Sequence, residues 1–248
     1  MTLALGALLF FAAAGAGALN AVIGGGTFLS FPALVFAGVP AVTANATNAL
    51  ALVPGSLASA FAFRRELASS RRQLWWMSVA SSAGGGVGGV LLLTTSERTF
   101  TALVPWLLLV ASALFTAGPW LVARLPPARI TSLLPLAAAQ FAISVYGGYF
   151  GGGMGILMMG AWSLLGLTDV HAMAALRTWL AVLINATAVV AFVAAGRIAW
   201  APGAVMICGA TLGGYFGASL VRRLSPKTLR LVVVTLAWSM TAVFFVRR

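Results

Sequence analysis

Apolar runs of about 20 residues recur from one end of this 248-residue chain to the other. A run of that length, wound as an α-helix, crosses the roughly 30 Å hydrocarbon layer of a membrane. The chain is 61% hydrophobic and 7% charged, whereas an ordinary soluble domain carries about 25% charged residues. A β-barrel would show short alternating segments instead. We therefore expect an all-α, polytopic membrane bundle.

The formal net charge of +12 does not indicate a nucleic-acid-binding protein. The basic residues lie at segment ends and short turns, where membrane topology explains them. No basic region exists outside the apolar runs to hold a nucleic acid. The first apolar run, "MTLALGALLFFAAAG", lacks the positive region of a secretory signal, so we expect it to be retained as a membrane segment.

Glycines, prolines and charge clusters divide the chain into ten helical segments. We predict helices at residues 3–23, 26–38, 43–63, 73–93, 98–122, 131–150, 153–166, 169–195, 200–221 and 226–246. The second and seventh segments reach only about 20 Å at 1.5 Å per residue. These two cannot cross a bilayer without the broken stretch that precedes each of them.

The two halves of the chain resemble one another. "IGGGTFLSFPAL" matches "FGGGMGILMMGA", and "SERTFTALVPWLLL" matches "SPKTLRLVVVTLAW". We infer two homologous copies of five helical segments, as in many transporters. The first membrane repeat covers residues 1–123 and the second covers 131–248, with a cytoplasmic linker at 124–130.

Loop charges favour an inverted relation between the copies. The loop after the third segment contains Arg64, Arg65, Arg71 and Arg72, whereas the equivalent loop of the second copy contains only Arg197. The next pair of loops shows the opposite bias, and basic loops stay in the cytoplasm. If the short segments dip in and return without crossing, the copies are parallel instead. Both models place the same number of basic residues inside, so we favour inversion on the exchanged pattern alone.

Two glycine breaks interrupt the apolar runs, in "NAVIGGGTFLSFPAL" and in "YGGYFGGGMGILMMG". A glycine run at membrane depth ends one helix and starts another. Amide groups at the new helix start cannot face lipid, but they and the helix dipole favour a bound anion. The candidate ligands here are Gly24, Gly25, Gly26, Thr27, Gly151, Gly152, Gly153 and Met154. The alternative is close helix packing, which we expect for "SSAGGGVGG" at 81–89.

A polar stripe follows in "AVTANATNALALVPGSLAS", beside an expected helix break at Pro54. Such a stripe binds an oxyanion, a sodium ion or a neighbouring helix. The residues that share its face are Asn45, Asn48, Gly55, Ser56 and Ser59. With Thr47 and freed carbonyl groups, Asn45 and Asn48 are also the candidate ligands for a coupling cation.

The equivalent segment of the second copy contains Arg177, about 12 Å inside its start, with Asn185 two turns further on near the same face. A cation within a membrane span usually marks a site, and the arginine fork fits an oxyanion. The alternative is that Arg177 snorkels to the interface. We expect Asp169 to cap the helix start and His171 to be interfacial rather than catalytic.

Other residues indicate structure rather than chemistry. Trp75, Trp76, Trp162 and Trp200 are predicted interface anchors. Cys208 is expected to be a small buried core residue. No cluster fits a metal, and no carboxylate pair or nucleophile motif supports hydrolysis. We therefore expect neither an enzyme nor a cofactor.

The same residues carry a resemblance to a known family. "IGGGTFLSFPALVFAGVPAVTANATNALALVPGS" and "YGGYFGGGMGILMMGAWSLLGLTDVHAMAALRTWLAVLINATAVVAF" resemble the two signatures of the TauE/SafE family of sulfite exporters, also called DUF81 or TSUP. The resemblance implies movement of sulfite, sulfoacetate or other organosulfonates across the bacterial inner membrane. It implies seven or eight spans in two copies, and the two short segments account for the difference from ten.

The sequence thus predicts a multi-pass secondary transporter that exports small sulfur-containing anions. The interior-negative potential drives an anion outward, so export needs no coupling ion. An anion channel or an ion-coupled uptake permease of the same fold stays open, and a membrane enzyme acting on lipid phosphate is disfavoured. The expected partners are the anionic substrate and membrane lipid, not nucleic acid, and a homodimer is left open.

The inverted relation predicts a labelling pattern. In a Cys208→Ser background, Arg65→Cys and Arg223→Cys should both react with a membrane-impermeant thiol reagent from the cytoplasmic side, because both equivalent basic loops then lie inside. The measurement is the labelled fraction in oriented membrane vesicles. Labelling from opposite sides would instead establish parallel copies.

Overall fold

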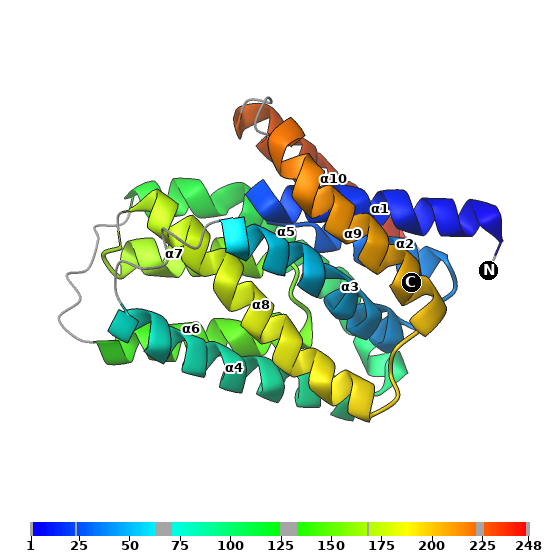
Figure 1. Ribbon diagram of the computed structural model, residues 1–248, viewed down its shortest axis with the longest axis horizontal. Helices are drawn as coiled ribbons and strands as arrows, with labels where there is room; N and C mark the ends of the chain where they lie inside the picture. Colours follow the sequence, from blue (N-terminus) through cyan, green and yellow to red (C-terminus); the bar gives the residue numbers. More distant parts are fainter. Residues whose placement is uncertain are drawn as a thin grey trace.

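The computed structural model describes residues 2–22, 24–62, 71–124, 133–167, 169–221 and 226–246. These residues form ten helices and no strand, which confirms the predicted all-α bundle and places every predicted segment within a few residues (Figure 1). Arg65, Arg223 and the predicted linker beyond Arg124 lie outside the described residues. The helices are α1 (Leu3–Val22), α2 (Thr27–Phe36), α3 (Ala41–Ala62), α4 (Arg71–Thr94), α5 (Glu97–Arg124), α6 (Leu133–Tyr149), α7 (Met154–Leu164), α8 (Val170–Ala194), α9 (Trp200–Val221) and α10 (Pro226–Val246).

Four of these helices are long and apolar enough to cross a membrane by length and composition: Leu3–Ala21, Arg72–Thr94, Glu97–Gly118 and Ala172–Ala194. Helices α2 and α7 are the short segments, with 10 and 11 residues. Each begins directly after a glycine break, as the sequence predicts. The breaks therefore lie inside the bundle and not at its ends.

Helices from the two halves of the chain pack against one another. Helix α1 packs along α9, and α6, the equivalent of α1, packs along α4, the equivalent of α9. Likewise α3 contacts α9, and α8 contacts α4. The pairs α3–α8 and α5–α10 join equivalent helices directly. Each of these contacts therefore recurs when the two halves of the chain are exchanged.

Small residues allow the helices to approach closely where α1 crosses α9 and where α4 crosses α6. A Cβ atom on Gly209 or Gly213 of α9 would strike the carbonyl oxygen of Phe10 or Ala14 in α1. In the equivalent crossing, a Cβ on Gly84 would lie 2.6 Å from the Phe141 carbonyl oxygen. Close backbone approach of this kind is how helices associate in lipid. The prediction that residues 81–89 serve packing is confirmed.

Equivalent helices α5 and α10 run antiparallel. The rings of Trp106 and Phe245 lie 5.2 Å apart between centroids. Further along α5, Thr116 accepts a hydrogen bond of 3.0 Å from the indole N–H of Trp238, which comes earlier in α10. As the residue numbers rise along α5, the residues of α10 that they contact have falling numbers.

The expected interface position of Trp162 is wrong. Its side chain is 0% exposed, and its indole N–H donates to Oε1 of Gln140 at 3.1 Å. The amide N–H of Gln140 in turn donates to the hydroxyl oxygens of Ser81 and Ser144. A tryptophan near a helix end is buried here because it lies on the inner face of α7, in an apolar cluster with Met77 and Leu136, where this polar network satisfies the indole. Trp75, Trp76 and Trp200 are exposed.

Two further expectations are corrected. Cys208 is exposed on α9 rather than buried, because the outer face of a membrane helix is as apolar as its core and hydropathy does not separate them. Pro54 does not break a helix, because α3 continues through it from Ala41 to Ala62. Proline is tolerated in such helices when neighbouring groups satisfy the freed backbone.

The close crossings predict a sharp difference between two glycines of α4. A Cβ on Gly88 would strike the Val145 carbonyl oxygen and lie 2.7 Å from the Tyr149 nitrogen, whereas a Cβ on Gly86 meets nothing within 4 Å. Gly88→Ala should therefore destabilise the fold by about 3 kcal/mol, and Gly86→Ala should not. The measurement is thermal unfolding of each purified variant in detergent. Equal unfolding temperatures would contradict the crossing.

Candidate functional site

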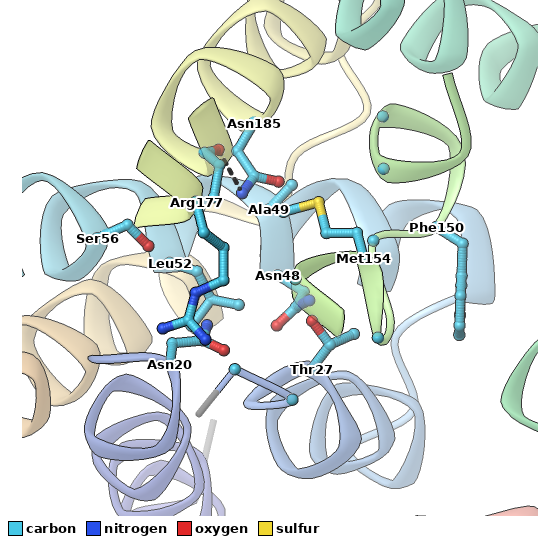
Figure 2. A pocket seen from close by; sticks show the side chains of 18 of the residues that line it. Asn20, Thr27, Asn48, Ala49, Leu52, Ser56, Phe150, Met154, Arg177 and Asn185 are labelled. Atoms are coloured by element: carbon cyan, nitrogen blue, oxygen red, sulfur yellow. Dashed lines mark hydrogen bonds between the residues drawn. The ribbon is translucent and has the colours of Figure 1, made fainter. Parts of the chain in front are cut away.

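An internal cavity lies where the two glycine breaks meet helices α3 and α8 (Figure 2). Most of the residues that the sequence predicts for the site line this one cavity, although they come from segments far apart in the chain. They are Gly24, Gly25, Thr27, Asn45, Asn48, Ser56, Gly151, Gly153, Met154, Arg177 and Asn185.

Three predicted residues do not line the cavity. Gly26 packs against Ala16 of α1, where a Cβ would strike a carbonyl oxygen. The hydroxyl of Thr47 accepts a hydrogen bond of 3.0 Å from the amide N–H of Ala199, just before α9. Gly152 packs on the ring of Phe150. These residues shape the surroundings of the cavity rather than its wall.

Other lining residues were not predicted from the sequence. For two of them the sequence contains a signal of a site: Asn20 is a polar residue in an apolar run just before the first break, and Thr178 follows Arg177. The three glycines of this set lie within the motif "YGGYFGGGMGILMMG". The apolar residues of the set have no such signal, because nothing local distinguishes a cavity wall from a packed core. This unpredicted set is Asn20, Ala49, Leu52, Gly147, Gly148, Phe150, Gly155, Thr178 and Ala181.

Each break is built by glycines in the left-handed backbone region. In the first, Gly24 and Gly25 have φ of 86° and 91°; in the second, Gly151 and Gly153 have φ of 77° and 74°. Side chains other than glycine rarely adopt these angles. The amide N–H of Gly26 donates to Oδ1 of Asn20 at 2.8 Å, so Asn20 fixes the first break.

The second break is fixed from α6. The Tyr146 hydroxyl donates to the carbonyl oxygen of Gly152 at 2.6 Å. The amide N–H of Gly151 donates to the Tyr146 carbonyl oxygen at 3.3 Å. The tyrosine thus contributes both its hydroxyl and its backbone, and the turn into α7 is held in one conformation.

Both breaks leave amide groups available at the cavity. Within the described part of the chain, no acceptor is found for the amide N–H of Gly25 and Thr27, or of Gly153 and Gly155. All four residues line the cavity. The starts of α2 and α7 also carry the partial positive charge of the helix dipole. Two helix starts therefore present donors to one internal space.

Arg177 lies between the two breaks. Its side chain is 5% exposed, so it does not snorkel to the surface. A Cβ on Gly24 would lie 3.9 Å from its Nη1, and a Cβ on Gly155 would lie 3.0 Å from its Cδ. Nη1 also lies 3.8 Å from the sulfur of Met159. Figure 2 shows the guanidinium extending from α8 toward Asn20.

The walls from α3 and α8 use equivalent positions with different chemistry. Four pairs separated by the same interval in the sequence line the cavity: Asn48 and Arg177, Ala49 and Thr178, Leu52 and Ala181, Ser56 and Asn185. The duplicated fold therefore supplies a nearly symmetric frame, while only one copy supplies a charge.

The cavity is small. The space in which a water molecule can be centred is about 50 Å³. One water needs roughly 10–15 Å³ of such space, so the cavity holds about four waters or a ligand of similar size. No group of His, Cys, Asp and Glu that could hold a metal occurs among the described residues.

The start of α8 agrees with the sequence analysis. The amide N–H of Ala172 donates to a carboxylate oxygen of Asp169 at 3.1 Å, which confirms Asp169 as the helix cap. The side chain of His171 lies outside the described part, so its interfacial position stays a prediction.

Long apolar helices, two paired helix breaks and an internal charged cavity define the class of protein: this is a membrane transporter. The chain belongs to the sulfite exporter TauE/SafE family, whose model matches residues 9–244. It is 29% identical over 237 residues to a probable membrane transporter protein of Haemophilus influenzae, covering 95% of this chain and 92% of that one. It is 30% identical over 240 residues to the probable membrane transporter protein YfcA of Escherichia coli K12, covering 95% and 87%. No solved structure matches the chain.

The geometry of the first break predicts a loss of ligand binding without loss of the fold. Gly24 and Gly38 have similar φ, 86° and 84°, but only Gly24 lines the cavity. Alanine at either position should cost about 1–2 kcal/mol of stability through backbone strain. Gly24→Ala should also weaken anion binding at least tenfold, because it re-orients the donors at the start of α2.

Calorimetric titration of the two purified variants with sulfite makes the comparison, and Gly38→Ala serves as the strain-matched control. Equal affinity for the anion in Gly24→Ala and Gly38→Ala would remove the first break from the site.

Proposed function

We propose that this protein is a secondary transporter that exports a small sulfur-containing oxyanion, sulfite or a small organosulfonate, across the bacterial inner membrane. The observation that carries the proposal is the position of Arg177, buried between two helix starts in a cavity of about 50 Å³. The printed description of the family, sulfite exporter, supports the choice of a sulfur oxyanion.

An anion suits this cavity on electrostatic grounds. The arginine contributes a full positive charge and a planar fork of donors that matches a trigonal oxyanion. Hydrogen bonds from protein groups to a charged ligand contribute about 1.5–3 kcal/mol each. The dipoles of α2 and α7 each add about 0.3–1 kcal/mol. A cationic ligand of the same size would gain none of these terms, and a neutral ligand would gain only weaker hydrogen bonds.

The membrane potential supports the proposed direction of export. When an anion leaves a cell with a negative interior, its free energy falls by about 2.3 kcal/mol per charge for every 100 mV of membrane potential. Export therefore needs no coupled ion. Uptake against that potential would need a coupled cation.

We propose a multi-pass, inverted arrangement of the two copies. The antiparallel pairing of α5 with α10 supports it, because those helices are equivalent in the two copies. In Figure 1 the ends of α3 and α5 and the starts of α4, α6 and α8 lie at the left, and both chain termini lie at the right. Arg72 at the start of α4 and Arg124 at the end of α5 belong to that side, which supports a cytoplasmic position for it.

The packing also supports two moving bodies, each built from both copies. One contains α1, α3 and α9, and the other contains α4, α6 and α8. The bodies meet at α3 and α8, where the cavity lies. Rocking of one body against the other would open the cavity to each side in turn, as in other transporters with repeats.

Arg177 variants test the function. Arg177→Lys keeps the charge but loses the two-pronged geometry, so the affinity for sulfite should fall about tenfold. Arg177→Gln should weaken binding further and reduce the selectivity for anions. Arg197→Gln is the matched control, because Arg197 is exposed between α8 and α9.

The measurement is sulfite uptake and counterflow in proteoliposomes, with binding by calorimetry on the same preparations. Saturable counterflow that Arg177→Gln abolishes and Arg197→Gln retains supports the transporter. Flux that does not saturate would indicate a channel. An Arg177→Gln affinity within about twofold of the unmodified protein would remove Arg177 from the site.

A further inference from the structure

The cavity contains buried acceptors that an anion alone cannot satisfy. Oδ1 of Asn45 and Oδ1 of Asn48 have no hydrogen-bond partner in the described part of the chain. Both side chains line the cavity and are 3% exposed. A buried acceptor without a donor costs free energy comparable to a lost hydrogen bond. The two oxygens therefore point to a ligand group that donates.

A neighbouring hydrogen bond fixes the orientation of the Asn45 amide. The Nδ2 group of Asn45 donates to the Tyr149 carbonyl oxygen at 3.0 Å. Exchanging Oδ1 and Nδ2 would set one carbonyl oxygen against another, so Oδ1 must be the atom that has no partner. Asn45 is therefore an acceptor at the cavity and cannot become a donor to an anion.

On the opposite wall, the Nδ2 group of Asn185 is likewise used in a hydrogen bond to a backbone carbonyl oxygen. Its Nδ2 donates to the Ala181 carbonyl oxygen at 3.0 Å, the bond drawn as a dashed line in Figure 2. Its carbonyl oxygen is thereby left for the cavity that the residue lines. Figure 2 also shows Asn48 and the hydroxyl of Thr27 facing one another across the same space. Acceptors thus gather beside the donors of Arg177 and the breaks.

We propose that the transported anion carries its own hydrogen-bond donor, an O–H or N–H group, which binds the carbonyl oxygens of Asn45, Asn48 and Asn185. The proposal rests on the anion-transport function above and defines its substrate class. The cavity of about 50 Å³ suits a compact ligand in which donor and anionic oxygens share one central atom. A singly protonated oxyanion is such a ligand, and the fully deprotonated dianion is not.

A sodium ion is the competing occupant of these oxygens. It would share a cavity of about 50 Å³ with the charge of Arg177. Two positive charges within one small cavity repel strongly where little water screens them. A donor on the anion itself adds no charge, so it satisfies the acceptors without that repulsion.

The test compares two anions that differ in one group. Sulfamate and methanesulfonate have the same charge, the same sulfonate head and the same number of non-hydrogen atoms, but only sulfamate carries N–H donors. Calorimetry on the purified full chain should give sulfamate an affinity about tenfold higher or more, because a site built for a donor rejects the analogue that lacks one. Asn45→Leu should reduce that ratio to within about twofold.

A second arm identifies the O–H form. The apparent affinity for sulfite should rise as the pH falls and the monoanion replaces the dianion, while the affinity for methanesulfonate should not follow that titration. Because this comparison uses the unmodified protein, it holds even if Asn45→Leu does not fold. Asn185→Leu provides a second variant on the opposite wall.

The outcomes separate the two proposals. Equal binding of sulfamate and methanesulfonate would overturn the donor requirement and leave anion transport standing. Failure of both anions and of sulfite to bind would overturn the proposed function itself. If binding of both anions disappears when sodium is replaced by choline, the asparagine oxygens hold a cation, and the donor proposal is wrong.

Discussion

The requirement that every backbone polar group be satisfied away from lipid governs this structure. Two helices are broken in the middle of the bundle, and their free amides are turned to one internal cavity instead of the membrane. Arg177 obeys the same constraint, because its charge is costly anywhere in the apolar interior except beside polar groups. The site therefore lies where the fold has polar groups to offer.

Duplication explains why those groups converge. Each copy contributes one break and one long helix with polar positions, and the exchange of helices between copies brings both breaks to the junction of α3 and α8. The equivalent positions differ, since Asn48 occupies the place that Arg177 has in the other copy. One arginine gives the cavity a single positive charge. Two arginines at such close range would repel one another and would be much harder to bury.

The close crossings of α1 with α9 and of α4 with α6 give the bundle its rigid parts. Glycines allow backbone atoms to touch there, as Gly84 does against Phe141. The glycines at the breaks serve a different purpose, because Gly24 and Gly153 adopt φ angles that other residues avoid. The same residue type thus packs helices in one place and shapes a candidate binding site in another.

The sequence by itself determined the ten helices, the two breaks and the cluster of polar residues around them. Hydrophobic length and glycine chemistry are local, so "IGGGTF" and Arg177 could be interpreted without knowing their neighbours. Only the tertiary structure decided which faces are internal. Trp162 is buried and Cys208 exposed, against expectation, because lipid and protein core are equally apolar. Thr47 binds Ala199 instead of lining the cavity, and Asn20 takes a place there, because those contacts join segments that no local pattern connects.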